Sequence, residues 1–279
     1  MPFTLASAFR KQLPLSFETS VCFADHICCD AHSVVTRQHC FVQSERDILL
    51  RATITNTPWA PHLLCAFQTT DALHLVMDCA ERGSLWQTLE SAADNRLAES
   101  DLRWWVPQAV SAIGWCHSQG FAHRCVILAG IDCADMFVII RAPRDIKPHN
   151  FVVTRNARLQ LIDFGCAAPL LPAQSKDGRR AIPKPYCLVP CGTCDYISPE
   201  ILQAHEDALF AAEMNGEYEA NMHDEGYGCE TDWWSLGAVI YELAAGVAPF
   251  FAPDIKQTYS LIVEHEVNIS PRVSTNPSR

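Results

Sequence analysis

The sequence predicts an α+β fold in which short strands precede a mainly helical region. Two short apolar runs, 62–67 and 72–77, are separated by polar residues, which is typical of an antiparallel strand pair. Apolar residues recur at helical spacing from about 100 to 120 and again from 232 to 246. With 279 residues and 49% hydrophobic residues, the chain can bury one large core or the cores of two lobes.

Composition narrows the classes of partner. The formal net charge is −11 and no long basic run is present, which argues against nucleic acid or an anionic membrane as the main partner. No apolar run reaches the length of a membrane span, and the N-terminus shows no secretory signal. We therefore expect a cytoplasmic protein whose 14 cysteines are mostly free thiols. The sequence leaves the oligomeric state open.

The elements follow in order along the chain. Residues 1–33 show no sustained period. Apolar residues around Glu45 fit a helix with one apolar face, which the prolines of 57–61 end. The other predicted elements are a turn at 81–83, helices at 84–89 and from Ser100 to Gly120, a hairpin before Asp163, a long surface loop from 166 to 200, a short helix from Ser198, a solvated acidic helix and loop over 204–226, and helices at 232–246 and 254–265.

The stretch Arg144 to Asn150 and the triplet Asp163-Phe164-Gly165 carry the chemistry. An Asp, a Lys and an Asn stand at 145, 147 and 150, and the apolar run before Asp163 predicts that a hairpin joins the two loops. Phosphoryl transfer from ATP needs a carboxylate for the hydroxyl proton, a cation on the phosphoryl group, and oxygen ligands for Mg²⁺. The ordered pair of motifs therefore indicates a phosphotransferase site.

The chain resembles eukaryotic protein kinases of the AGC group. The motifs Cys191 to Glu200 (CGTCDYISPE), Asp232 to Gly237 (DWWSLG) and Gln43 to Leu49 (QSERDIL) resemble the branch of the myotonic dystrophy and Rho-associated kinases. This resemblance implies a two-lobed, kinase-like fold with a small, β-rich but incomplete N-lobe and a mainly helical, truncated C-lobe. Its parts would be an atypical segment 1–33, a partial N-lobe 34–79, a C-lobe 80–267 with an insertion at about 125–144, and a frayed tail 268–279.

The resemblance also implies roles for single residues. It makes the chain a serine/threonine protein kinase that uses ATP and Mg²⁺ on a protein substrate. Asp145 would be the catalytic base, and Lys147 would neutralise charge on the phosphoryl group. Asn150 and Asp163 would hold Mg²⁺.

Further roles implied by the resemblance concern the nucleotide and the substrate. Met77 would lie at the mouth of the adenine pocket, with Asp78 and Ala80 offering backbone hydrogen bonds. Glu45 would pair with a lysine on the third strand, although a solvated helix position is the alternative. Thr193 would lie in the substrate loop. Leu49, Leu63, His123 and Phe164 would form an apolar spine between the lobes, and Asp232 would hold the catalytic loop from below.

Two departures from the family leave an alternative open. The first glycine is Gly83, so no glycine-rich loop precedes Glu45, and the only lysine upstream of Glu45 is Lys11. In addition, 20 residues, Cys125 to Arg144, separate His123-Arg124 from Asp145; they are either a genuine bulge or translated non-coding sequence, and the second interpretation is favoured. The alternative function is a weak or inactive pseudokinase or fragment that acts by protein binding.

A zinc-binding module is a third, more distant hypothesis. Cys187, Cys191 and Cys194 are close in sequence, but a fourth ligand at the usual spacing is missing. Ordinary loop cysteines are the favoured interpretation.

Overall fold

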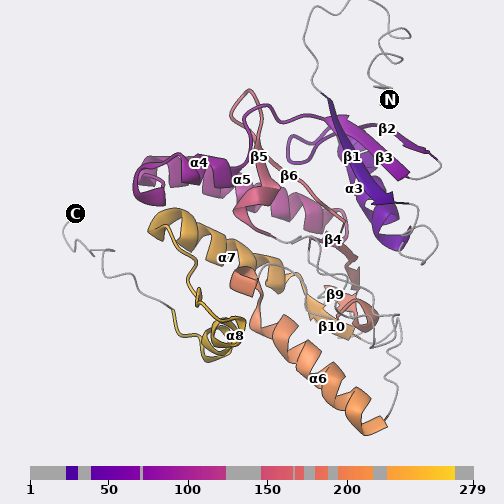
Figure 1. Ribbon diagram of the computed structural model, residues 1–279. Helices are drawn as coiled ribbons and strands as arrows, with labels where there is room; N and C mark the ends of the chain where they lie inside the picture. Colours follow the sequence, from indigo (N-terminus) through magenta and orange to yellow (C-terminus); the bar gives the residue numbers. More distant parts are fainter. Residues whose placement is uncertain are drawn as a thin grey trace, which may run out of the picture.

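The computed structural model describes residues 23–30, 39–69, 72–123, 146–165, 167–172, 180–187, 194–215 and 225–267. The predicted insertion at 125–144 and the tail 268–279 lie outside these residues. In Figure 1 the described chain forms two lobes, one with a small sheet and one helix, the other mainly helical. The α+β prediction with two lobes is confirmed.

The smaller lobe is a three-stranded antiparallel sheet in the order β1-β3-β2 beside helix α3 (His39–Thr55). Strands β2 (Leu63–Gln68) and β3 (Ala72–Asp78) confirm the predicted strand pair. Strand β1 (Phe23–Asp30) lies inside the segment 1–33, where the sequence predicted no element. Its sequence FADHICCD lacks the apolar alternation of a half-buried strand, and its pairing with β3, more than 40 residues away, defines it instead.

Helix α3 turns one face to the core. Ile48, Leu49 and Ala52 have no exposed surface, whereas Leu50 and Ile54, on the other side of the helix, are exposed. The spacing of three and four residues among the buried positions is that of a helix face. The helix predicted around Glu45 is therefore confirmed.

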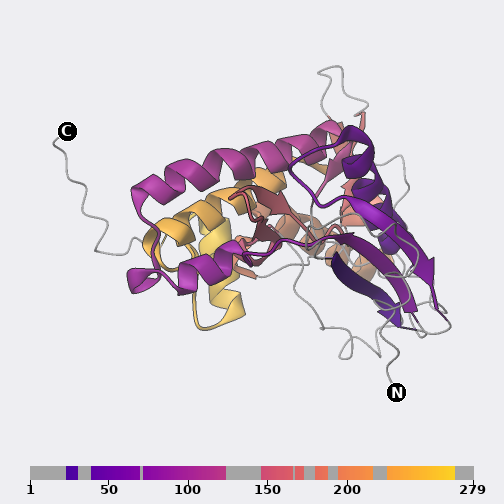
Figure 2. The same ribbon diagram turned by 90° about the horizontal axis from the view of Figure 1, so that it is seen from above.

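The larger lobe is built on two long helices. These are α5 (Glu99–Ser118) and α7 (Glu230–Ala245), and Figures 1 and 2 show them side by side. Helix α7 ends at Gly246, whose φ of +83° is the left-handed conformation that favours glycine. A Cβ atom there would lie 2.9 Å from the carbonyl oxygen of Asn95, so the helix end packs closely against the loop before α5.

Shorter helices complete this lobe. They are α4 (Leu85–Glu90), α6 (Pro199–Asn215), α8 (Ile255–Glu264) and the 3₁₀ turns η1 (Ala93–Asn95), η2 (Pro148–Asn150), η3 (Lys184–Cys187) and η4 (Cys194–Tyr196). Ser84 caps α4 in a capping box with Gln87, which explains why that helix begins where it was predicted. Helix α6 is longer than the short helix predicted from Ser198, because it continues into the acidic region expected to be partly loop.

The larger lobe also contains small antiparallel sheets. Strands β4 (Phe121–Ala122) and β7 (Ala168–Pro169) pair, as do β5 (Phe151–Val153) and β6 (Leu159–Leu161), which form the predicted hairpin. A third sheet has the order β10-β9-β8, with β8 (Leu171–Pro172), β9 (Arg180–Pro183) and β10 (Glu225–Gly228).

The prediction of a surface loop over 166–200 is wrong for the part that the structure describes. Ala168, Leu170 and Ile182 are buried there. The strands that carry or flank these residues pair with β4 and β10, which are remote in sequence, so local composition did not reveal them.

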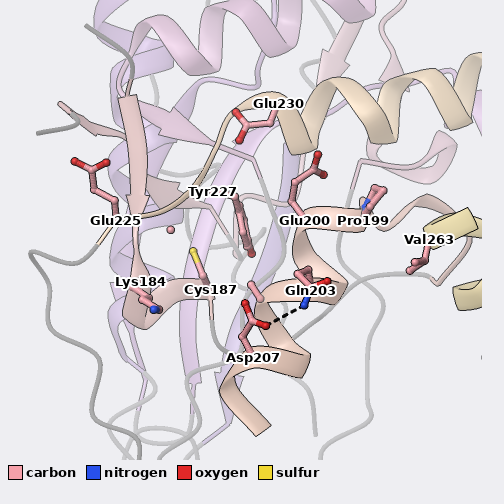
Figure 3. Close-up of a pocket in the computed structure, with 12 residues that line it drawn as sticks. Lys184, Cys187, Pro199, Glu200, Gln203, Asp207, Glu225, Tyr227, Glu230 and Val263 are labelled. Carbon is pink, nitrogen blue, oxygen red and sulfur yellow. Dashed lines mark hydrogen bonds between the residues drawn. The ribbon is translucent and has the colours of Figure 1, made fainter. Parts of the chain in front are cut away.

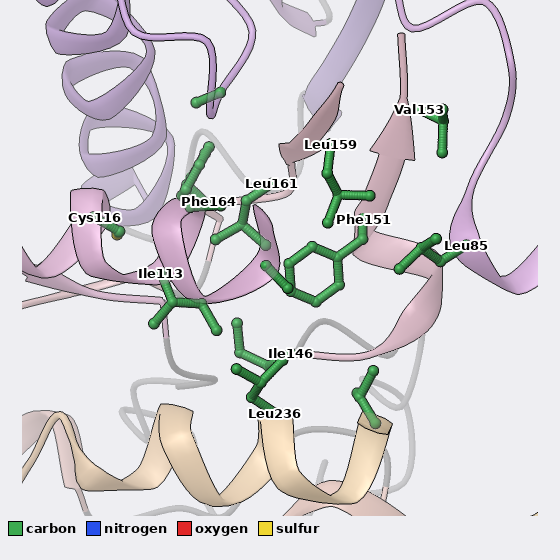
Figure 4. Close-up of a cluster of buried hydrophobic side chains, with 14 of the residues drawn as sticks. Leu85, Ile113, Cys116, Ile146, Phe151, Val153, Leu159, Leu161, Phe164 and Leu236 are labelled. Atoms are coloured by element: carbon green, nitrogen blue, oxygen red, sulfur yellow. The ribbon is translucent and has the colours of Figure 1, made fainter. Parts of the chain in front are cut away.

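The main core lies between α5, α7 and the β5–β6 hairpin. Figure 4 shows Ile113, Ile146, Phe151, Leu161 and Leu236 converging there from these elements and from the chain before η2. Burying each such side chain contributes about 1.5–3 kcal/mol. The hairpin that leads to Asp163 is therefore held on both sides by apolar packing. Among the helices that the structure describes, none combines the length and the apolar character needed to cross a membrane.

Candidate active site

Asp232 holds the chain at His123 and at the end of α5. Its Oδ2 atom accepts a hydrogen bond from the backbone N–H of His123 at 2.8 Å and lies 2.7 Å from Nε2 of His117, at the end of α5. Burial alone would raise the pKa of Asp232, but the hydrogen bond and charge of His117, with a contribution from His123, lower the pKa below its ordinary value. The carboxylate is therefore ionised at neutral pH and links α7 to α5 and to residue 123.

The catalytic loop and the Asp163 loop are joined through the backbone of Ile162. Its N–H donates to the carbonyl oxygen of Asn150 at 3.0 Å, and its carbonyl oxygen lies 3.0 Å from Nε2 of His123. The ring of Phe164 meets the ring of His123 edge-on, with centroids 5.3 Å apart. Asn150 and Asp163 are thus brought to one neighbourhood by contacts on both sides.

Asn150 and Asp163 fit a magnesium ion by their chemistry. Each offers a side-chain oxygen, the hard donor that Mg²⁺ prefers. Asn150 is buried, and so is the Oδ1 atom of Asp163, whose φ of +63° is a rare conformation for a residue other than glycine. Strain of this kind is often found at functional sites.

Lys147 is joined to Asn150 through the backbone, since its carbonyl oxygen accepts from the N–H of Asn150 at 3.0 Å. It immediately precedes η2 and is buried except for about 5% of its surface. A lysine that is buried to this extent is expected to take part in a charge interaction, because burying an unpaired ammonium group costs free energy. The turn η2 and the residue before it therefore bury both Lys147 and Asn150.

Sequence reasoning missed the aromatic support of this loop. The ring of His149 stacks on Trp86 of α4, with centroids 4.6 Å apart and planes 16° apart. Burial lowers the pKa of His149, repulsion from Lys147 lowers it further, and Glu90 opposes both effects. In the sequence, His149 stands out only as the neighbour of Asn150. No local pattern indicates that its ring stacks on Trp86.

The end of β3 and the residues that follow it carry the predicted adenine contacts. Met77 is buried in the main core, and the backbone N–H of Asp78 donates to the carbonyl oxygen of His62 at 3.2 Å. The Asp78 carboxylate accepts from the backbone N–H of His62 at 3.3 Å. These contacts fix the course of the chain toward Ala80, and the role of His62 in them was not predicted.

Glu45 is buried rather than solvated. Only 3% of its surface is exposed, and it lies one turn before Ile48 and Leu49 on α3. A buried carboxylate is costly unless it is paired, and Glu45 does take part in a polar or electrostatic contact. The solvated-helix alternative for Glu45 is therefore wrong.

The four residues of the predicted apolar spine lie in or against the core. Leu49 and Phe164 belong to the main core, Leu63 packs against that core, and His123 contacts Phe164. Two predicted site residues, Asp145 and Thr193, lie outside the described residues. The placement of the catalytic base and of the substrate loop therefore stays a prediction.

The zinc hypothesis receives no support from the described cysteines. Cys187 is buried, with Sγ 3.7 Å from the carbonyl oxygen of Pro183, as expected of a core thiol. Cys191 lies outside the described residues. Among those that the structure describes, no group of three His, Cys, Asp or Glu side chains is placed to hold a metal ion.

Comparisons with known proteins agree with the motifs. The family model for the protein kinase domain matches residues 140–278. Serine/threonine-protein kinase MRCK alpha from Mus musculus is 34% identical over 227 residues, which are 81% of this chain and 10% of that relative. MRCK beta from Homo sapiens gives the same values, and MRCK gamma from Mus musculus is 34% identical with 12% of its length covered.

The matched region of the relatives is a small part of each. The chain spans about a tenth of the length of the curated relatives that it matches. The identity nevertheless extends over most of this chain and includes the N-terminal side of residue 140, where the family model does not reach. The chain therefore belongs to the protein kinase family and is related to the MRCK serine/threonine kinases of the AGC group.

Proposed function

We propose that this chain transfers the γ-phosphoryl group of ATP to a serine or threonine hydroxyl of a protein. The observation that supports this most strongly is the junction at Ile162, whose backbone contacts both Asn150 and His123. That junction ties the backbone at Asn150 to the residue before Asp163, which supports the assignment of both residues to one site. Phosphoryl transfer depends mainly on such positioning and on charge stabilisation.

In the proposed reaction the substrate hydroxyl oxygen bonds to the γ-phosphorus as the bond to the β-phosphate oxygen breaks. Asp145 accepts the hydroxyl proton, and ADP leaves. Lys147 stabilises charge on the transferred group. Asn150 and Asp163 hold Mg²⁺, which when bound neutralises phosphate charge.

The remaining site residues bind and orient. The backbone carbonyl of Asp78 and the N–H of Ala80 contact the adenine edge, with Met77 at the mouth of that pocket. Glu45 would pair with a lysine on the third strand, a residue that β1 (FADHICCD) does not carry, and Thr193 lies against the acceptor residue. The two hydrogen bonds between His62 and Asp78 support the adenine assignment.

A transfer assay tests the proposal. The purified chain is incubated with Mg²⁺, γ-labelled ATP and a protein rich in serine and threonine, and label in protein is measured. We expect transfer from the wild type and a loss of at least about 100-fold in Asp163→Ala, because a positioned charge in the site is removed. Asp101→Ala, which removes an exposed carboxylate on α5, is the control and should retain transfer. No transfer from the wild type, or full transfer from Asp163→Ala, contradicts the proposal.

The second candidate function is protein binding without catalysis. It is favoured by strand β1, FADHICCD, which carries no lysine, and by the lack of any glycine before Gly83. A ligand that binds the folded state raises the apparent melting temperature. A melting temperature that is the same with and without MgATP supports this second function, whereas a clear increase argues for the enzyme.

A further inference from the structure

Helix α4 is tied by its backbone to β5, the strand that follows η2. The N–H of Arg82 donates to the carbonyl oxygen of Val153 at 3.0 Å, and the N–H of Val153 donates to the carbonyl oxygen of Gly83 at 2.8 Å. Ser84, the N-cap residue of α4, also forms a β-bridge with Val152. Because β5 begins directly after η2, these bonds hold the start of α4 close to the end of that turn.

The chain enters α4 through a turn that requires glycine. The φ angle of Gly83 is +74°, the left-handed conformation that residues with a side chain rarely adopt. A Cβ atom at this position would overlap Oε1 of Gln87, which accepts from the N–H of Ser84 at 3.0 Å in the capping box. The direction of the helix is therefore fixed in its first turn.

The side chains of α4 reach both the main core and η2. Leu85 and Leu89 are buried in that core, and Trp86 packs against it while part of its surface stays exposed. The other contact of Trp86 is the stack on the ring of His149, which is itself exposed. Burial does not fix an exposed imidazole ring, so the stack supplies packing that holds His149 in place.

His149 and Asn150 are the last two residues of η2, a turn of only three residues. Because a 3₁₀ turn has poorer hydrogen-bond geometry than an α-helix, contacts from outside the turn set its orientation. The carbonyl oxygen of Asn150 accepts from the N–H of Ile162 at 3.0 Å, which is a backbone contact of this kind. The stack of His149 on Trp86 adds a side-chain contact from α4.

We propose that Trp86 is a positioning residue for the metal ion. By stacking on His149 it fixes η2, and the side-chain oxygen of Asn150 is thereby held ready for Mg²⁺. A ligand that is already in place loses less conformational freedom when the ion binds, so the ion binds more tightly. The inference rests on the proposed function, in which Asn150 is a ligand of Mg²⁺.

Metal binding tests this role without any phosphoryl transfer. Mn²⁺, which prefers the same oxygen donors, replaces Mg²⁺, and electron paramagnetic resonance measures the free ion in solutions of the full chain with ADP. ADP alone is the blank. We expect Trp86→Ala to weaken Mn²⁺ binding about fivefold, or by about 1 kcal/mol, which is the contribution of one aromatic pair. Trp86→Phe keeps a ring that can stack and should stay within about twofold of the wild type.

A double-mutant cycle assigns the effect to the stack. His149→Ala should weaken Mn²⁺ binding about as much as Trp86→Ala does. The double variant should be no weaker than either single variant, because both substitutions remove the same contact. His149 is exposed, so its variant keeps the test valid if Trp86→Ala unfolds.

Leu89→Ala is the control for a merely structural role of α4. It leaves a cavity under the same helix and lowers stability, which urea unfolding measures, but it keeps both rings. Its Mn²⁺ affinity should equal that of the wild type.

Asp207→Asn is the control for general attraction of the ion to acidic surface. Asp207 lines a cavity of about 560 Å³ beside α6, outside the proposed site (Figure 3). Four carboxylates line this cavity, those of Glu200, Asp207, Glu225 and Glu230. The Mn²⁺ affinity of Asp207→Asn should be unchanged.

Equal Mn²⁺ affinity in the wild type, Trp86→Ala and His149→Ala overturns the proposal. The same loss in Leu89→Ala or in Asp207→Asn also overturns it, because the effect would then come from stability or from another site. A wild type that binds no Mn²⁺ contradicts the metal role of Asn150 as well. If the expected affinities are found in a chain that transfers no phosphoryl group, only the proposed function fails.

Discussion

At the scale of single residues, the negative charge of Asp232 contributes directly to the stability of the fold. Its carboxylate contacts His117 and the backbone of His123, and it has only 2% of its surface exposed. Its pKa is lowered in the folded state. A lowered pKa contributes stability above the ordinary carboxyl value, and this stability is lost as the pH falls through the lowered pKa.

Asp232→Asn should therefore lower the free energy of unfolding by about 3 kcal/mol at pH 7, since one partner of a buried pair loses its charge. The difference between the wild type and the variant should shrink as the pH falls below 3.8, the ordinary value for an aspartate. Urea unfolding at several pH values measures both effects.

Asp254→Asn serves as the matched control, because Asp254 is exposed and makes no side-chain capping bond to α8. It should change stability by less than about 0.5 kcal/mol. A pH-independent difference for Asp232→Asn would show that its charge has no part in stability.

At the scale of elements, the residue types in strand β1 determine which side chains are available to contact a nucleotide phosphate. In the antiparallel register His26 lies opposite Leu75, and Ala24 lies opposite Met77. Directly paired residues share a face of the sheet. Leu75 and Met77 belong to the same core cluster as Ile48 and Leu49 of α3, so the face of β3 that carries them is turned toward that helix.

His26→Lys should increase the affinity for MgATP about tenfold, because one charge-assisted contact contributes about 1.4 kcal/mol. Isothermal titration calorimetry measures the affinity. Asp25→Asn adds the same net charge on the opposite face of the strand, and an equal gain from it would contradict the register argument.

At the scale of the whole molecule, the connection from His123 to Ile146 joins two residues whose positions are fixed by their contacts. His123 is fixed by Asp232 and Ile162, and Ile146 is buried in the main core. Removing residues 125–144 restores His123-Arg124-Asp145 and leaves two residues between the fixed points. A shorter connection loses less conformational entropy on folding.

The deletion of 125–144 should raise the free energy of unfolding by about 2 kcal/mol. Urea unfolding measures it, and a variant with a Gly/Ser linker of equal length in place of 125–144 is the control that should show no gain. A deletion variant that is less stable than the wild type would mean that these residues are an integral part of the fold.

Much of the fold could be predicted because its elements have strong local patterns. Helices α3, α5, α7 and α8 and the β2–β3 pair were predicted from their apolar patterns and from the residues that bound them. Strand β1 and the ladders of β7 and β9 were missed, since their residues lack a periodic pattern and their partners lie far along the chain.

The sequence by itself determined the chemistry: the ordered Asp, Lys and Asn at 145, 147 and 150, followed by Asp163, mark a phosphotransferase lineage. Only the tertiary structure decided that Glu45 is buried, that Trp86 supports His149, and that an acidic cavity opens beside α6. The physical reason is that motifs are local in sequence, whereas burial, stacking and cavities arise from packing between segments that are distant in sequence.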